Sequence, residues 1–371
     1  MIDRRIRYLT ARTSVGPGGE FKIAIDLSPT DEEAPPQDHD CEIKGGEKAI
    51  ISACETYWEK VANIVGGLEK HPDETTLKNQ VIILKSLAIE FTKSIFDQRT
   101  MRLIWEAADN CEALLIVTDL VNFPWEALVN PWAADRQFLL QKCAVFRRAR
   151  INSTREVRKS TEPVAPSEIA IFVDAELDEK WRGANTQKTL PHLFREYAAL
   201  AASRKRVHIC GELDNIFDLI RQMRVVTMIC ENESDKYGDR LRIAKGLHLT
   251  SAVVEAEAID QDAVLFLFTC GRGSDADKTL QHLLPLPAFI ATVHGCTVIA
   301  PLMPISEFVG IQLMRKIVTL LIWRYRHLGR HVILLEEIQR LRDGEFFGSP
   351  TLAGIMSLFF AIYGRPTAQL S

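Results

Sequence analysis

The sequence predicts an α/β protein whose mainly parallel β-sheet is covered by helices on both faces. From residue 113 onward, runs of strand length alternate with stretches of helical periodicity. The runs are apolar at consecutive positions, which is typical of parallel strands buried on both faces. The chain has 371 residues, of which 47% are hydrophobic and 25% charged, so it can bury a substantial core in one or two domains.

The N-terminal part of the chain predicts a smaller structure that packs against this sheet. Residues 21–27 alternate in polarity and predict a strand at a sheet edge, whereas the Asp-, Glu- and Pro-rich residues 28–42 predict a mobile acidic loop. Two amphipathic helices are expected next, over residues 47–65 and 76–95. One face of the second helix carries Val81, Leu84, Ala88, Phe91 and Ile95.

The remaining elements follow in a regular order. Strands are predicted at residues 113–117, 138–147, 168–173, 206–210, 225–230, 263–270 and 296–300. Helices are predicted at residues 190–203, 213–223 and 306–326, and a hairpin-like insertion at residues 241–249. We therefore expect residues 1–110 to pack on a sheet domain of residues 111–371, either as a distinct part or within one continuous domain.

Charge and composition argue against several classes of protein. A net charge of −4 and a pI near 6.2 argue against direct nucleic-acid binding. No apolar run approaches the roughly 18 residues of a membrane span, and no signal-peptide core follows the charged N-terminus. The eight cysteines form no CxxC pair, so we expect neither a metal site nor a disulfide framework, and we expect a reducing cytoplasm. No cofactor is expected either.

Residues 263–273 present one cysteine in the way that a nucleophile requires. An apolar strand delivers Cys270 onto a bend that reads Gly271-Arg272-Gly273. Sites in parallel sheets lie beyond the C-terminal ends of strands, and both Cys230 and Cys270 are expected at such ends. A nucleophilic cysteine also needs a base, or an electropositive surrounding, that holds it as the thiolate.

The order of several motifs resembles the CHAT group of caspase-like cysteine peptidases. Residues 121–128 read VNFPWEAL, similar to the IPWE motif of the family, and residues 138–147 read FLLQKCAVFR, similar to its FLAERYAVSR phrase. Residues 298–300 and 313–321 resemble the VIA strand and the FM..F...LL helix that follow the nucleophile. The resemblance implies a caspase-like α/β fold and endopeptidase chemistry. Members of the family often act in bacterial defence or signalling with sensor domains or partner proteins.

The chain departs from the family pattern at the base. The resemblance places a His-Gly pair directly after Cys230, where this sequence reads Glu231-Asn232-Glu233. Glu231 therefore occupies the expected position of the base. A carboxylate beside a thiol disfavours the thiolate, whereas a histidine can take the thiol proton and remain beside the anion as a cation.

Three hypotheses follow. The first is a degenerate CHAT protein that acts as a binding, regulatory or assembly subunit with protein partners. The second is an active cysteine endopeptidase that cleaves a peptide or protein, in which Cys270 works with His248 or with a base supplied by a partner, and amides around Gly271 and Gly273 stabilise the oxyanion. The third is a small-ligand sensor in the strand-end crevice, which no phosphate-binding loop supports. Whether the chain is an enzyme is left open.

Several other residues have both a functional and a structural interpretation. His248 is interpreted either as a candidate base or as a histidine of a sheet. His294 is interpreted as a turn residue, although His294-Gly295 imitates the His-Gly pair of the family. His208 is interpreted as a core histidine. Arg272 and Asp275 flank the cysteine as candidate pocket residues or as solvated loop charges, and Asp235 and Asp239 are candidates to line a pocket for a basic side chain. Trp125 is expected to pack under the sheet and Glu126 to tie down a loop. A basic run is interpreted as a solvated connector: Arg147, Arg148, Arg150, Arg155, Arg158 and Lys159.

Overall fold

The chain divides into two compact units. The first comprises Met1–Asn152, Lys278–Leu284 and Ile338–Ile362, and the second comprises Ser153–Asp277, Pro285–Glu337 and Tyr363–Ser371. The computed structural model describes residues 6–15, 21–28, 39–42, 46–66, 73–120, 123–149, 169–173, 207–210, 225–235, 238–244, 247–256, 259, 263–270, 286–302, 332–333, 360–364 and 369–370. The division that we predict after residue 110 stays a prediction.

The first unit contains strands in the order β5–β4–β1–β2–β3. Their bounds are β1 (Ile6–Val15), β2 (Phe21–Ser28), β3 (His39–Glu42), β4 (Ala113–Thr118) and β5 (Ala144–Ala149). β1, β4 and β5 run parallel to one another, whereas β1–β2 and β2–β3 are antiparallel. The alternate residues Leu9 and Ala11 of β1 and Ile23 and Ile25 of β2 are buried, as expected for strands with one face on a core.

Three of the sequence predictions in this unit are wrong in part. β2 is a strand as predicted but it is not the edge, because β3 pairs with it on the outer side, within residues predicted to be a loop. β1 was not predicted, since its buried Leu9 and Ala11 are interspersed with polar side chains. The strand predicted at residues 138–147 is a short helix, α4 (Leu139–Lys142), followed by β5.

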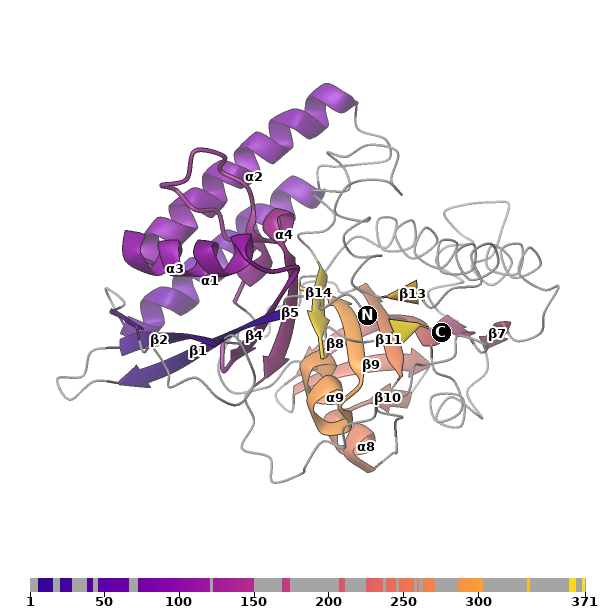
Figure 1. The fold of residues 1–371 in the computed structure, drawn as a ribbon. Helices are drawn as coiled ribbons and strands as arrows, with labels where there is room; N and C mark the ends of the chain where they lie inside the picture. Colours follow the sequence, from indigo (N-terminus) through magenta and orange to yellow (C-terminus); the bar gives the residue numbers. More distant parts are fainter. Residues whose placement is uncertain are drawn as a thin grey trace. The chain divides into compact units, whose positions relative to one another are not determined.

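Helices α1 (Gly46–Gly66), α2 (Glu74–Ile95) and α3 (Gln98–Asp109) lie together on one side of these strands (Figure 1). α1 and α2 confirm the two predicted amphipathic helices, with Leu84, Ala88, Phe91 and Ile95 of α2 buried as expected and Val81 half-buried. α3 was not predicted. It begins three residues after α2 because the side chain of Asp97 accepts a hydrogen bond from the Thr100 amide at 2.7 Å and so caps a new helix.

The second unit confirms the predicted parallel strands. Its strand order is β10–β9–β8–β11–β12, with β6 beside β8 and β7 beside β6. The bounds are β6 (Ile169–Val173), β7 (Val207–Cys210), β8 (Val225–Asp235), β9 (Gly238–Ala244), β10 (Leu247–Leu249), β11 (Val264–Cys270) and β12 (Thr297–Pro301). β6, β7, β8, β11 and β12 pair in parallel, and β8, β9 and β10 form the predicted antiparallel insertion.

The remaining described elements are α8 (Ser251–Ala256), α9 (Leu286–His294), β13 (Val332–Ile333), β14 (Phe360–Tyr363), β15 (Gln369–Leu370) and the 3-10 turn η1 (Trp125–Ala127). Gly364 follows β14 with φ at 120°, and a Cβ atom there would lie 2.5 Å from the carbonyl oxygen of Cys296. The helices predicted at residues 190–203, 213–223 and 306–326 lie outside the described residues. Residues 29–38 of the predicted loop also lie outside them. Within the described part, no helix has the length and apolarity to cross a membrane.

Candidate functional site

Two parallel strands that flank β8 in the second unit stop at nearly the same level. β11 ends at Cys270, which stands opposite Glu231 of β8 in the parallel register. On the other side of β8, β6 ends at Val173 opposite Ile229. β8 itself continues beyond this level to Asp235. The C-terminal edge of parallel strands is where sites form in such sheets.

β8 is longer than the sequence predicts. It was expected to end at Cys230, but it runs to Asp235 because β9 replaces β6 as its partner from Glu231 onward. Cys230 is therefore within a strand, and its prediction as a strand-end residue is wrong. Cys270 does end its strand as predicted.

A single cross-strand row contains the candidate residues. Glu231 stands opposite Cys270 on one side and opposite Arg242 of β9 on the other, and Arg242 in turn stands opposite His248 of β10. Neighbouring strands are about 4.8 Å apart, so three strand spacings place the Cys270 and His248 backbones about 14 Å from each other. Cys270 and Glu231 are thus immediate neighbours, whereas His248 is half-buried two strands further away.

Arg242 was not singled out from the sequence. A signal was available, because arginines alternate at positions 240 and 242 of β9 while glutamates alternate at positions 231 and 233 of β8. The register sets Glu231 opposite Arg242 and Glu233 opposite Arg240. Opposite charges at directly opposed positions favour one antiparallel register over its neighbours, so the charge pattern suits this hairpin.

The other candidate residues fall around this row or outside the described residues. Asp235 ends β8 and Asp239 stands opposite Ser234, so both are near the tip of the hairpin. They lie about 13 Å and about 10 Å along the hairpin from Glu231. Their role in a pocket stays a prediction. The Cys270 bend, with Gly271, Arg272, Gly273 and Asp275, lies outside the described residues.

Two other histidines occupy structural positions. His294 is the last residue of α9, and its Nε2 atom lies 2.9 Å from the carbonyl oxygen of Val254 on α8. This contact connects two helices of the second unit, which accounts for the histidine without catalysis. His208 is in β7, within a strand as predicted.

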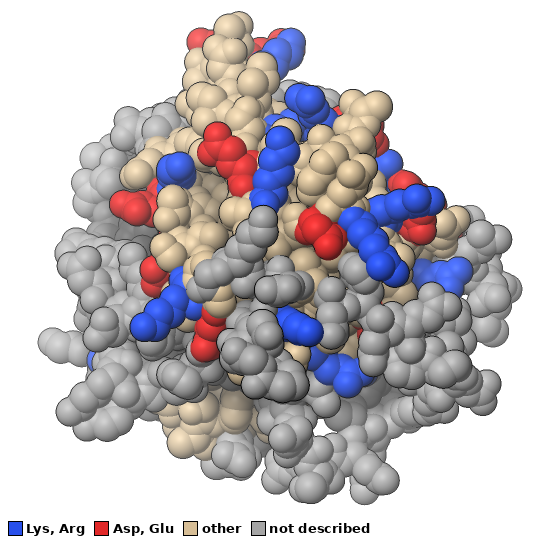
Figure 2. All heavy atoms as spheres, turned by 90° about the vertical axis from the view of Figure 1, so that its left-hand side faces the viewer, with Lys and Arg blue, Asp and Glu red and all other residues tan. Residues whose placement is uncertain are grey.

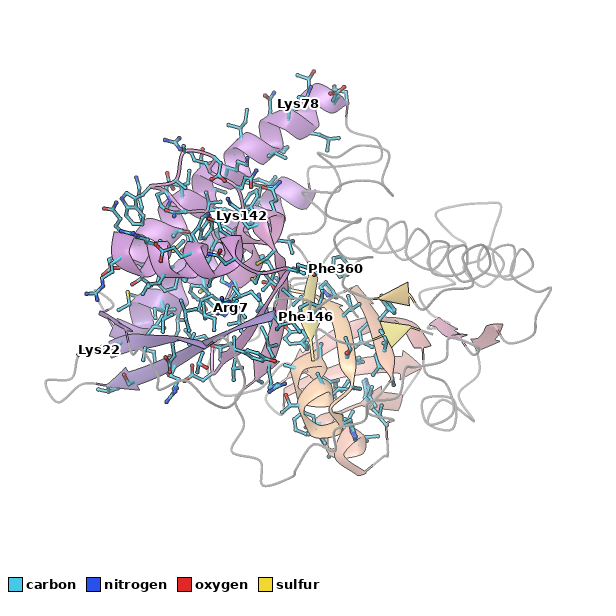
Figure 3. The ribbon with its side chains drawn as sticks, viewed as in Figure 1. Arg7, Lys22, Lys78, Lys142, Phe146 and Phe360 are labelled. Carbon is cyan, nitrogen blue, oxygen red and sulfur yellow. The ribbon has the colours of Figure 1, made fainter. Side chains whose placement is uncertain are left out.

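The Trp125-Glu126 motif is a buried structural feature of the first unit. Trp125 is fully buried, and its ring centroid lies 4.6 Å from that of Phe123, within a chain of aromatic contacts that extends to Phe96, Phe91 and Tyr57. Side chains fill this layer between the helices and the strands, down to the buried Phe146 of β5 (Figure 3). Burial also raises the pKa of Tyr57. The expectation that Trp125 packs in the core is met.

Glu126 is held by a buried arginine. Arg147 of β5 donates from Nε to Glu126 Oε1 at 2.7 Å and from a second guanidinium nitrogen to Oε2, and both side chains are at most 1% exposed. Glu126 therefore ties the η1 turn to β5, as expected. Placing Arg147 in a solvated connector was wrong, because a bidentate carboxylate allows a guanidinium to be buried inside the strand. Arg148 is half-buried, and the rest of the basic run lies outside the described residues.

Charges are mixed on the described surface of the first unit. On the face shown in Figure 2, lysine and arginine side chains are interspersed with aspartate and glutamate. That face offers the phosphates of a nucleic acid no continuous basic field among its described residues. The described residues also contain no group of three His, Cys, Asp or Glu side chains arranged to hold a metal ion.

Comparisons with known proteins identify the fold alone. No family model matches the chain. No curated protein matches it. Two crystal structures of the Saccharomyces cerevisiae separase–securin complex match 99% of the chain at 9% identity, with TM-scores of 0.52 and 0.53. A crystal structure of the Arg-specific cysteine proteinase gingipain R is similar at 10% identity, with a TM-score of 0.44. The match covers 85% of this chain and 76% of the gingipain chain.

The likeness to separase shows that the chain has a caspase-like peptidase fold, as the sequence predicted. The chain spans 30% of the length of the separase chains that it matches.

Proposed function

We propose that the chain is a CHAT-like protein whose peptidase site is degenerate, and that it acts by binding protein partners. The observation that carries this proposal is the parallel register in which Cys270 and Glu231 are direct neighbours. The resemblance places the nucleophile at the first position and the base at the second. A carboxylate-bearing residue therefore stands where a histidine would be needed.

The chemistry of that pair opposes catalysis. A cysteine attacks a peptide carbonyl as the thiolate, and a neighbouring negative charge disfavours that form. The base must also return a proton to the leaving amine, a role that suits a histidine because its ordinary pKa lies near neutral pH.

An active cysteine endopeptidase is the second candidate. It is favoured by the position of His248 in the same cross-strand row as Cys270. A general base works within about 3 Å of the proton that it takes, or through one water. With two strands between them, Cys270 and His248 would need an intervening group, or the base would have to come from a partner.

Protein partners are proposed by analogy of fold. The separase structures similar to this chain contain a second protein, securin. A fold by itself does not determine function, so this analogy supports partner binding as a class and identifies no partner. The bacterial defence or signalling role that the CHAT resemblance implies belongs to the same proposal.

The proposal is tested by the reactivity of Cys270. Iodoacetamide alkylation is followed peptide by peptide from about pH 5.5 to about pH 9, with the other cysteines as internal references. We expect Cys270 in the unaltered chain to react as an ordinary or slow thiol at neutral pH. A rate that stays high well below the ordinary thiol pKa of about 8.5 would mean an activated thiolate and would favour the endopeptidase.

Two histidine variants test whether position 231 is the one that influences the reactivity of Cys270. Glu231→His is expected to accelerate alkylation of Cys270 near neutral pH, because an imidazolium beside the sulfur favours the thiolate. Glu233→His is the matched control, since it adds the same side chain to the same strand two residues from the Cys270 level. Equal effects of the two variants would refute the assignment of position 231 as that of the base.

A further inference from the structure

Two cysteines lie side by side where two central strands of the first unit begin. Cys111 comes two residues before β4, and Cys143 comes directly before β5. The amide of Ala144 donates to the carbonyl oxygen of Glu112 at 3.0 Å, and Ala113 pairs with Ala144 in the parallel register. Strands in contact are about 4.8 Å apart, so a one-residue offset sets the two Cα atoms about 6 Å apart, a span that disulfides bridge.

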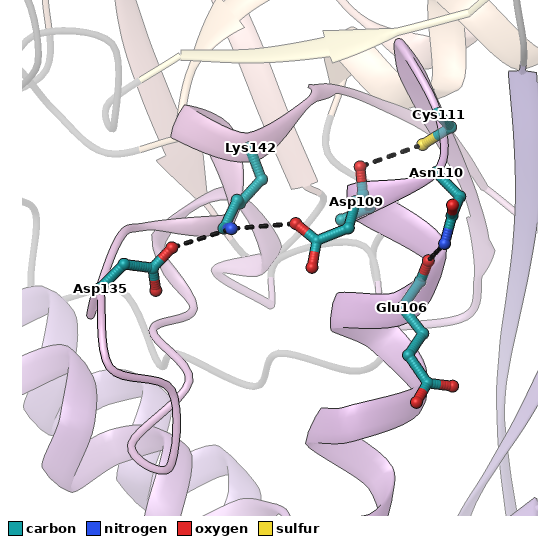
Figure 4. A network of polar contacts seen from close by, with 7 residues as sticks. Glu106, Asp109, Asn110, Cys111, Asp135 and Lys142 are labelled. Carbon is teal, nitrogen blue, oxygen red and sulfur yellow. Dashed lines mark hydrogen bonds and ion pairs between the residues drawn. The ribbon is translucent and has the colours of Figure 1, made fainter.

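Ion pairs also connect the residues that precede these two cysteines. Lys142, the residue before Cys143, places its Nζ atom 2.9 Å from Asp109 Oδ1 and 2.8 Å from Asp135 Oδ2 (Figure 4). These contacts raise the pKa of Lys142 and lower that of Asp135. Because Asp109 is two residues before Cys111, the cysteines are flanked by an ion pair and by a strand hydrogen bond.

The two thiols interact directly and differ in exposure. The side chain of Cys143 hydrogen-bonds the sulfur of Cys111, which also lies 3.8 Å from the carbonyl oxygen of Ala108. Cys111 is half-buried, whereas Cys143 is 1% exposed. An accessible sulfur therefore stands against a protected second thiol.

The surroundings of Cys111 favour its thiolate. The hydrogen bond from Cys143 is the main cause that lowers the pKa of Cys111, and the charge of Arg7 on β1 acts in the same direction, against burial and the Asp109 carboxylate at the end of α3. The buried Cys54 of α1 and Cys41 of β3 behave oppositely. Burial raises the pKa of the Cys54 thiol to about 12 and also raises that of Cys41.

We propose that Cys111 and Cys143 form an oxidation site at which a hydroperoxide converts the two thiols into a reversible disulfide. In the first step, the Cys111 sulfur attacks one peroxide oxygen. An S–O bond forms, the O–O bond breaks, and the leaving oxygen takes up the Cys111 thiol proton to give an alcohol, or water when the oxidant is hydrogen peroxide. In the second step, the Cys143 sulfur attacks the resulting sulfenic acid. The S–S bond forms, the S–O bond breaks, and the hydroxyl leaves as water with the Cys143 proton.

The test uses hydrogen peroxide on the full chain at pH 7, followed by alkylation of the remaining thiols and peptide mapping. We expect a peptide pair joined through Cys111 and Cys143 that a dithiol reductant separates again. We also expect Cys111 to be consumed at least about tenfold faster than Cys54, because its thiolate fraction is larger. Random pairing among the cysteines, or consumption of Cys111 no faster than that of Cys54, would overturn the proposal.

Single substitutions assign the two roles. In Cys143→Ala, oxidation should stop at a sulfenic acid on Cys111, which dimedone labels. In Cys111→Ser, Cys143 should remain reduced at the same peroxide concentration because it is buried. Cys54→Ala is the matched control and should cross-link as the unaltered chain does. Dimedone labelling of Cys143 in Cys111→Ser would contradict the assigned order of attack. If a variant fails to fold, peptide mapping of the unaltered chain still tests the proposal.

Discussion

Removing one partner of the buried Arg147–Glu126 pair should strongly destabilise the first unit. Both side chains are at most 1% exposed, and the guanidinium donates to both carboxylate oxygens, so a single substitution leaves an unpaired charge inside the protein. Such a change typically costs about 3–5 kcal/mol. With an m-value of about 3 kcal/mol/M in urea, Arg147→Met and Glu126→Leu should each lower the unfolding midpoint by about 1–1.7 M.

The assay is urea unfolding followed by near-ultraviolet circular dichroism, which reports the packed aromatic rings around Trp125. The double variant Glu126→Leu/Arg147→Met should cost less than either single variant, because no unpaired charge remains. Arg148→Met, on the same strand but half-buried, is the matched control and should change stability by about 0.5 kcal/mol or less. Single variants that unfold like this control, or a double variant that costs the sum of both, would refute the buried-pair reasoning.

Three further predictions concern stability. Gly364→Ala should destabilise the second unit by about 2 kcal/mol or more, since a Cβ atom would meet the Cys296 carbonyl at a φ of 120°; thermal unfolding at an unchanged Tm would contradict the close approach. Asp97→Ala should cost about 1 kcal/mol in urea unfolding, because it removes the cap of α3, whereas Asp97→Asn should retain most of it. Burial raises the pKa of Cys54 from 9.0 to about 12, so the folded state keeps a proton that the unfolded chain releases. The free energy of unfolding should therefore fall from about pH 9 towards pH 12, by up to about 1.4 kcal/mol per pH unit, and Cys54→Ala should remove that part of the slope; equal slopes would count against the shift.

The parts of the fold that the sequence predicts are those with a local periodic signal. Helix α2 repeats its buried residues with helical spacing, and β4 and β11 each contain five consecutive apolar residues, so their burial follows from the pattern alone. α3 carried the same signal in Met101, Ile104, Trp105 and Ala108, together with a capping aspartate at position 97, but it begins so soon after α2 that the break was missed. β1 has only two fully buried residues, and it becomes a strand through pairing with β4, more than one hundred residues later.

In the candidate site, too, the sequence predicts the features that have a local signal and misses those that depend on pairing between strands. The position of Cys270 at a strand end follows from the sequence, because the apolar run stops at the letters Gly271-Arg272-Gly273. The length of β8 does not follow from the sequence, because residues 231–235 are polar and all five are held in the strand by pairing with β9. The burial of Arg147 was also out of reach, since it depends on a carboxylate 21 residues earlier in the chain whose position the fold determines.

The pairing of β1 with β4 has a consequence for the synthesis of this protein. β1 and β2 are neighbours in the chain and are translated early, but Ile6 meets its parallel partner Ala113 only after more than one hundred further residues have been translated. At about 5–20 residues per second, that interval lasts roughly 5–20 s, during which one whole edge of β1 has no native strand to pair with. An open edge recruits strands from other chains, so the nascent hairpin is the segment where we expect chaperone binding or co-translational aggregation to begin.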